Sequence, residues 1–292
     1  MTPPSTLYSL GGIVQWIDES LNTMLLNGLA QNVERLTAAI WAPLEIGVFI
    51  SLLIYGFLIA TQRIPTPFTE ALVKIVKIVV IVAIVESGGF YQTQIMDAML
   101  DLPDELTSVV VGEPTNTRDV LADFHNKGLE TATKIDERAP SIMTQIGRSI
   151  LFAIVSLIIT IIYTAVTIVG ILLMSVVKIG MALVVALGPM FIAALLFEQT
   201  KELFGQWLSQ CLYFTLFGAV FTLMFSLVMG MLGYIQNILL GLADAPEINI
   251  LQIMAAVMLI GTLSIFLMKL PSTIVGKVTG GASISVPFLG NI

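Results

Sequence analysis

Few side chains in this sequence could perform catalytic chemistry. The 292 residues include one histidine, His125, and one cysteine, Cys211. A single histidine excludes an H-E-x-x-H zinc motif, and a single cysteine forms neither an intramolecular disulfide nor a metal cluster. Every aspartate lies outside the long apolar stretches, and no G-x-S-x-G, P-loop or G-x-G-x-x-G occurs. We therefore expect no enzyme activity, no metal and no cofactor.

His125 and Cys211 each have a simple structural interpretation. His125 lies in the most polar part of the chain, which favours a solvated or capping residue over a catalytic one. Cys211 lies in an apolar run, which favours a small hydrophobic residue in the core.

Three charged residues near the apolar stretches are the candidate membrane-charge contacts. An uncompensated charge inside a bilayer costs about 2.5–3.5 kcal/mol even on the gentler scales, so such residues usually have a partner or a function. Lys74 and Lys77 lie one turn apart, where they could snorkel to the head groups or form a basic collar that contacts a partner. Glu45 lies about one turn into the first apolar stretch, where an interfacial position and a buried partner explain it equally well.

The composition predicts an all-α, polytopic transmembrane protein. Hydrophobic residues make up 57% of the chain, charged residues only 11%, and mean hydropathy is +0.95. A soluble domain has about 25% charged residues. The net charge of −7 argues against a broad nucleic-acid-binding surface. Six stretches approach the length of a helical span: Ala39–Ala60, Ala71–Val85, Ile150–Val177, Met181–Phe197, Leu212–Leu232 and Ile250–Leu270.

The number of crossings depends on the fourth stretch, which Gly188-Pro189 interrupts. If all six stretches cross, the two ends of the chain share a side. If residues 181–197 re-enter instead, the chain crosses five times and the charge asymmetry of the positive-inside rule improves. We favour five crossings, with the N-terminus and the central loop on the outer side of the membrane and the C-terminus in the cytoplasm. In that topology one side carries Arg63, Lys178, Lys201, Lys269 and Lys277.

The chain divides into five parts by composition. These are an N-terminal amphipathic segment (1–37), two spans (38–87), a central polar loop (88–148), a C-terminal transmembrane region (149–270) and a tail (271–292).

The central loop is expected to hold two helices, around Tyr91–Leu100 and Thr117–Asp136. We expect breaks at Pro103, at residues 112–114 and at Pro140. The loop is too small to build its own core, so it should pack on the membrane body, a sister subunit or a partner.

The segment Ala186–Gln210 concentrates the unusual features of the sequence. An apolar run is broken at Gly188-Pro189, a short polar stretch follows, and Phe204, Gly205 and Trp207 precede the next apolar stretch. Trp207 could be an interfacial anchor, or it could pack internally or dock a partner.

This segment resembles the TrbL-like proteins, the sixth-component inner-membrane subunits of VirB-type type IV secretion systems. The run LGPMFIAALLFEQTKELFGQW has that family's Gly-Pro break, apolar stretch, polar turn and tryptophan, and the layout of the whole chain is also similar. The matching positions are Gly188, Pro189, Phe197, Phe204 and Trp207.

The resemblance implies a non-enzymatic platform in a machine that moves DNA or protein and assembles a conjugative pilus. It implies a ring-forming homo-oligomer in the bacterial inner membrane, with a periplasmic N-terminus and a large periplasmic central loop. It also implies contacts with lipid, pilin, the minor pilin at the tip, secretion ATPases and other inner-membrane subunits, and transient contact with DNA. A small-molecule transporter or exporter is the alternative, although the spans offer few polar groups to line a substrate path.

Overall fold

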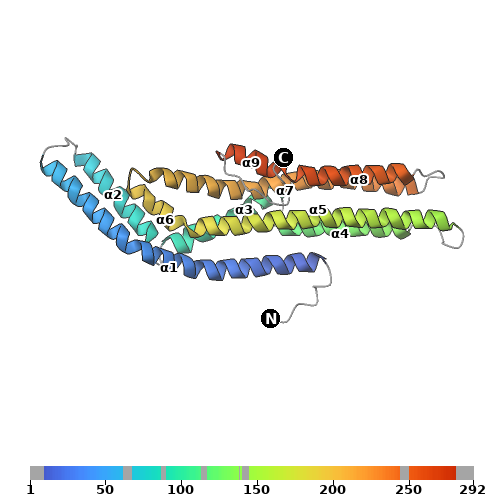
Figure 1. Ribbon diagram of the computed structural model, residues 1–292, viewed down its shortest axis with the longest axis horizontal. Coiled ribbons are helices and arrows are strands. Elements are labelled where there is room, and N and C mark those ends of the chain that lie inside the picture. The colour runs from blue at the N-terminus through green and yellow to red at the C-terminus, as the bar shows by residue number, and fades with distance from the viewer. Residues whose placement is uncertain are drawn as a thin grey trace. The chain divides into compact units, whose positions relative to one another are not determined.

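The computed structural model describes residues 10–61, 68–86, 90–112, 117–137, 139, 145–243 and 250–280, and all regular structure in them is helical. The predicted all-α class is therefore confirmed (Figure 1). The elements are α1 (Leu10–Ala60), α2 (Phe68–Val85), the π-helical turn η2 (Tyr91–Ile95), α3 (Met96–Val111), α4 (Thr117–Glu137), α5 (Ile146–Ala186), α6 (Gly188–Ala193), the 3₁₀ turn η3 (Ala194–Leu196), α7 (Lys201–Ala243), α8 (Ile250–Leu267) and α9 (Leu270–Val278).

Four segments among the described residues are long and apolar enough to cross a membrane. They overlap the first, third, fifth and sixth predicted stretches: Asn32–Ala60, Ile146–Ala186, Lys201–Tyr234 and Met254–Val278. The second stretch forms α2, which carries Glu70, Lys74 and Lys77 within its 18 residues. The fourth is divided among the end of α5, α6 and η3. The preference for five crossings therefore stays a prediction.

Prolines lie inside two of the helices, and one of them contradicts the sequence expectation. Helix α1 runs through the amphipathic segment and the first apolar stretch without a break, with Pro43 in its interior. The expected break at Pro103 is wrong, because Pro103 lies inside α3. A proline ring fixes φ near the helical value, so flanking turns that pack well can retain it at the cost of one hydrogen bond. The break after residue 111 is confirmed, since α3 ends there and Gly112 has φ +81°. Residues 113, 114 and 140 lie outside the described residues.

The chain forms two compact units. One comprises Met1–Leu21, Pro103–Lys178 and Thr215–Ile292, and the other comprises Asn22–Leu102 and Ile179–Phe214. Helices α5 and α7 therefore supply residues to both units.

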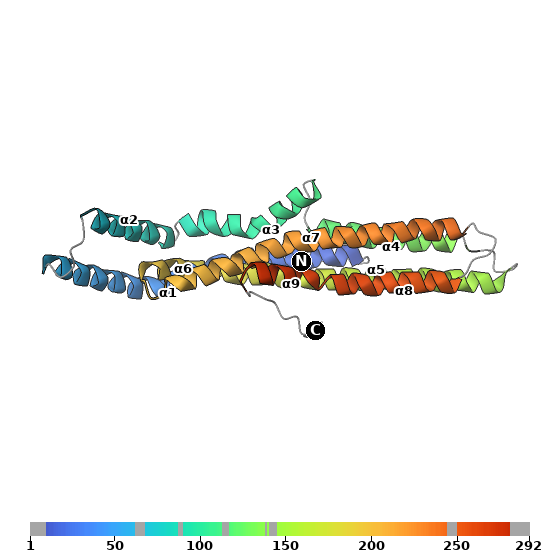
Figure 2. The same ribbon diagram turned by 90° about the horizontal axis from the view of Figure 1, so that it is seen from above.

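In the first unit, the polar helix α4 lies beside α5 and α7 (Figures 1 and 2). The ring of Phe124 stacks on Tyr163 of α5 at 4.7 Å between centroids and meets Phe225 of α7 edge-on at 4.8 Å. The Ser156 hydroxyl on α5 donates a hydrogen bond to the Ala132 carbonyl on α4 at 3.1 Å. Helix α4 therefore packs on the membrane body, one of the three surfaces that the sequence offered for the central loop.

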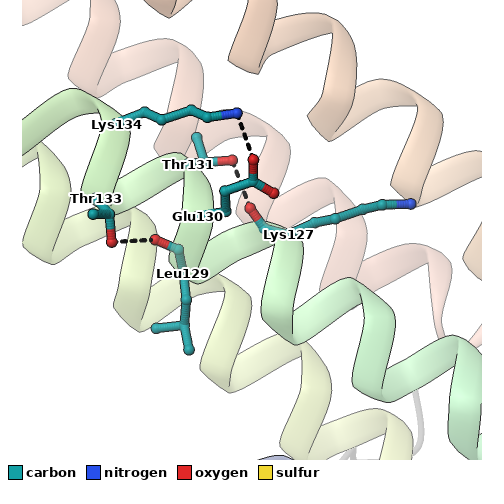
Figure 3. Close-up of polar contacts among 6 residues, drawn as sticks. All are labelled: Lys127, Leu129, Glu130, Thr131, Thr133 and Lys134. Carbon is teal, nitrogen blue, oxygen red and sulfur yellow. Dashed lines mark hydrogen bonds and ion pairs between the residues drawn. The ribbon is translucent and has the colours of Figure 1, made fainter.

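The outward face of α4 is charged. Lys127 pairs with Asp123 at 2.7 Å and Lys134 with Glu130 at 2.5 Å, all with about half of each side chain exposed. Figure 3 shows the second of these pairs, with the Thr131 hydroxyl donating to the Lys127 carbonyl on the same helix. Exposed pairs at this spacing contribute only about 0.3–0.5 kcal/mol each, so they do not fix the position of α4.

Large apolar side chains are exposed along α1, α2 and α5. On α5 they recur at helical spacing, for example at Ile150, Ile154, Leu157 and Ile161. Water would solvate such a stripe poorly, whereas lipid chains match it. The exposed faces of these helices are those expected of a protein embedded in a bilayer.

Candidate functional site

The Gly-Pro segment predicted by the sequence lies in the second unit and ends helix α5. Pro189 has no N–H to donate to the carbonyl four residues earlier, and it occupies the first turn of α6, where that donor is not needed. The predicted break at Gly188-Pro189 is therefore confirmed. After η3 the chain turns at Phe197, and the Thr200 hydroxyl donates to the Ala194 carbonyl at 2.7 Å just before α7 begins.

Two aromatic side chains satisfy the carbonyls at the end of α5. The last four carbonyls of any helix lack an intrahelical donor. The Tyr91 hydroxyl donates to the Val185 carbonyl, whose own partner four residues later would be Pro189. The Trp207 indole N–H donates to the neighbouring Val184 carbonyl at 2.8 Å. The helix end is thereby closed by side chains from η2 and α7.

Gly188 makes room for Tyr91. A Cβ atom at position 188 would lie 1.8 Å from the Tyr91 hydroxyl oxygen and 2.3 Å from the ring carbon that bears it. Tyr91 itself is 1% exposed. Sequence reasoning missed this contact, because nothing in one sequence pairs a tyrosine with a glycine 97 residues away.

Trp207 and its neighbours form an aromatic cluster. Trp207 is 4% exposed, lies 6.3 Å from Phe191 and 5.5 Å from Phe204 between ring centroids, and stacks nearly parallel to Phe191. Its single polar atom is already bonded to Val184. The cluster therefore presents only apolar ring surface to its surroundings.

Phe204 and Trp207 of this cluster, with Leu208, form one wall of a cavity of about 510 Å³ that lies wholly within the second unit. The other walls come from α2, η2, α3, α6 and η3. The lining residues are Lys77, Val80, Ile81, Ile84, Ile95, Met99, Ile192, Leu195, Phe204, Trp207 and Leu208.

The structure brings some of the predicted site residues together and separates others. Phe204, Trp207 and Lys77 line the cavity, whereas Gly188 contacts Tyr91 and the buried Pro189 lies in the first turn of α6. Three others lie apart from the cavity lining. Phe197 packs against the α1 backbone, with its ring 3.1 Å from where a Cβ of Gly47 would be, the Lys74 ammonium lies 4.1 Å from the ring centroid of Tyr55, and Glu45 is exposed on α1.

The expectation that His125 is solvated or caps a helix is wrong. His125 lies on α4 with 5% of its surface exposed, and its Nδ1 has no hydrogen-bond partner among the described residues. It is buried because it lies next to Phe124 on the face that α4 turns towards its neighbours. This burial lowers the pKa of His125, which keeps the imidazole neutral near pH 7. Cys211 is 3% exposed, as expected of a core residue.

Among the described residues, no group of three or more His, Cys, Asp or Glu side chains could hold a metal ion. The site is thus an apolar cavity with one lysine in its lining, next to a helix end whose carbonyls are capped by Tyr91 and Trp207. Lys77 is the one ionisable side chain in this lining, and the other lining residues are suited to binding or packing an apolar group.

Comparisons with known proteins connect this arrangement to a family. The family model described as TrbL/VirB6 plasmid conjugal transfer protein matches residues 48–270. A type IV secretion system protein VirB6 of Bartonella quintana is 24% identical over 254 residues, covering 82% of this chain and 75% of that protein. A VirB6 protein of Bartonella henselae is 22% identical over 211 residues, covering 70% of this chain and 60% of that protein.

An uncharacterised Rickettsia conorii protein is 24% identical over 226 residues, which cover 74% of this chain but only 25% of that protein. The family match extends from the first candidate span to the last and includes the Gly-Pro break, both carbonyl-capping aromatic residues and every residue that lines the cavity. It covers more than half of the chain, and on that ground the chain belongs to the TrbL/VirB6 family of plasmid conjugal transfer proteins.

Proposed function

We propose that this chain is an inner-membrane subunit of a type IV secretion machine, and that it serves as a platform for pilus assembly and for passage of DNA or protein. The observation that carries the proposal is the family match over residues 48–270, supported by two relatives named VirB6. As a platform, the chain forms a ring-like homo-oligomer. It contacts pilin, the minor tip pilin, secretion ATPases and other inner-membrane secretion subunits, and it touches DNA only transiently.

The interior of the first unit supports a scaffold more than a solute path. Several of its buried threonines, including Thr167 and Thr222, donate their hydroxyl hydrogens to carbonyls one turn earlier on their own helices. Such hydroxyls have already used their one donor hydrogen, so they have no O–H to offer a passing solute. No observation in the described residues favours the alternative of a small-molecule transporter.

Deleting the gene should test the proposed function directly. We expect the deletion strain to lose both pili and DNA transfer to recipient cells, and we expect a plasmid copy of the gene to restore both. Retention of pili and transfer, with loss of uptake or export of a small solute, would instead establish the transporter alternative.

Cysteine labelling should fix the topology, because position 211 is buried and contributes little background. In a Cys211→Ala chain, Asn126→Cys on α4 should react with a membrane-impermeant maleimide in spheroplasts. Lys277→Cys on α9 should react only after lysis. Both positions are exposed. Five crossings place them on opposite sides of the membrane. Labelling of both from the same side would replace this arrangement with six crossings.

A further inference from the structure

We propose that the cavity beside Trp207 is a binding site for one anionic phospholipid, with an acyl chain against the apolar walls and the phosphate on Lys77. The proposal concerns the second unit alone and does not depend on the secretion role.

The cavity walls select an apolar occupant. Ten of the eleven lining residues are aliphatic, aromatic or methionine side chains. The one polar atom among those ten, the Trp207 indole nitrogen, already donates to the Val184 carbonyl. A polar solute would therefore lose its hydrogen bonds to water without gaining others, whereas a hydrocarbon chain would lose none. The volume of about 510 Å³ lies in the usual range of about 300–1,000 Å³ for small-molecule sites.

The single charge in the lining selects the sign of the head group. Lys77, Val80, Ile81 and Ile84 occupy one face of α2, and Lys77 is the first of these four residues along the chain. Lys77 and Ile84 are seven residues apart, which is about 10 Å along a helix axis. A cation thus stands at one end of an apolar wall about as long as the upper part of an acyl chain. An ammonium among apolar side chains requires an anion or water, and a lipid phosphate supplies the anion.

The neighbouring lysine does not duplicate this role. The Lys74 ammonium lies over the Tyr55 ring at 4.1 Å from its centroid, and Lys74 does not line the cavity. A cation–π contact of this kind partly satisfies its charge. Lys74 and Lys77 therefore provide a matched pair on one helix, of which only Lys77 should sense the occupant.

Trp207 provides the probe, because bromine atoms on an acyl chain quench indole fluorescence at close contact. The protein carrying Trp16→Phe and Trp41→Phe, which leaves Trp207 as its only tryptophan, is reconstituted into vesicles of unlabelled phosphatidylcholine. Brominated phosphatidylglycerol or brominated phosphatidylcholine is then added in increasing proportion. We expect saturable quenching whose midpoint falls at an about fivefold lower mole fraction for the glycerol lipid, as one ion pair would give.

Three further substitutions separate a specific site from general lipid contact. Lys77→Gln should remove the preference for phosphatidylglycerol, and Lys74→Gln, which makes the same charge change one turn away, should keep it. Val80→Phe should weaken quenching by both lipids because the added ring occupies the cavity. Thermal unfolding in detergent verifies that each variant is folded.

Equal midpoints for the two lipids, or a preference that survives in Lys77→Gln, would overturn the proposal. So would an absence of quenching by either lipid, since it would mean that the cavity is closed or is filled by a helix of a sister or partner protein.

Discussion

Replacing Gly188 with alanine should destabilise the protein by about 2–4 kcal/mol, which lowers its thermal midpoint by roughly 5–10 °C. The added methyl group would overlap the Tyr91 hydroxyl and ring, at 1.8 and 2.3 Å. Tyr91 must then move, and its hydrogen bond to the Val185 carbonyl is lost. That carbonyl cannot find a substitute donor in Pro189, so it stays buried without a partner. Thermal unfolding of the purified protein in detergent measures the change.

Gly205 supplies the matched control, since it lies in the same motif and a Cβ atom at that position would have nothing within 4 Å of it. Alanine there should be neutral or should stabilise by up to about 1 kcal/mol, because alanine favours a helix interior over glycine. Adding Tyr91→Leu to Gly188→Ala should recover part of the loss. The interaction is absent if Gly188→Ala and Gly205→Ala unfold at the same temperature, or if the two changes at positions 91 and 188 are simply additive.

The sequence predicts the features that local chemistry determines. Long apolar runs define the four strongest spans, and Pro189 ends a helix because a missing N–H acts wherever it occurs. The features that sequence reasoning misses depend on contacts between distant segments. The sequence pattern places Tyr91 at the start of a helix, and only the fold shows that its hydroxyl closes the end of α5.

The predictions for Pro103 and His125 are both wrong because each rests on the residue and its sequence neighbours, without the packing of the helix that contains it. A helix break is predicted at Pro103, but the structure keeps this residue inside α3, where its chain neighbours on both sides remain helical. The polar neighbours of His125 in the sequence predict a solvated side chain. The helical period nonetheless places His125, like Phe124, on the side of α4 that packs against the bundle. When a polar segment packs on an apolar body, the average composition of the segment does not reveal which few of its positions are buried.

The Phe124 contact yields the second large effect. Phe124→Ala should cost about 3–5 kcal/mol, because the side chain is fully buried and bridges Tyr163 of α5 and Phe225 of α7. The loss should concentrate in α4, whose outward ion pairs are too weak to hold it in place. Hydrogen exchange followed by mass spectrometry should show faster exchange of the amides of residues 117–137 than in the unaltered chain, with a smaller change in α8.

Leu129→Ala tests whether the effect comes from that contact, since Leu129 lies on the same helix but is 40% exposed. It should change stability by less than about 0.5 kcal/mol and leave exchange in α4 unaltered. Faster exchange in both variants would mean that removing apolar surface anywhere on α4 destabilises the helix, whichever residue is replaced. Unchanged exchange in Phe124→Ala would mean that α4 is held by something other than the bundle. If the contrast holds, the Phe124 side chain supplies most of the packing that holds α4 against α5 and α7, and the ion pairs on its outward face contribute little to that position.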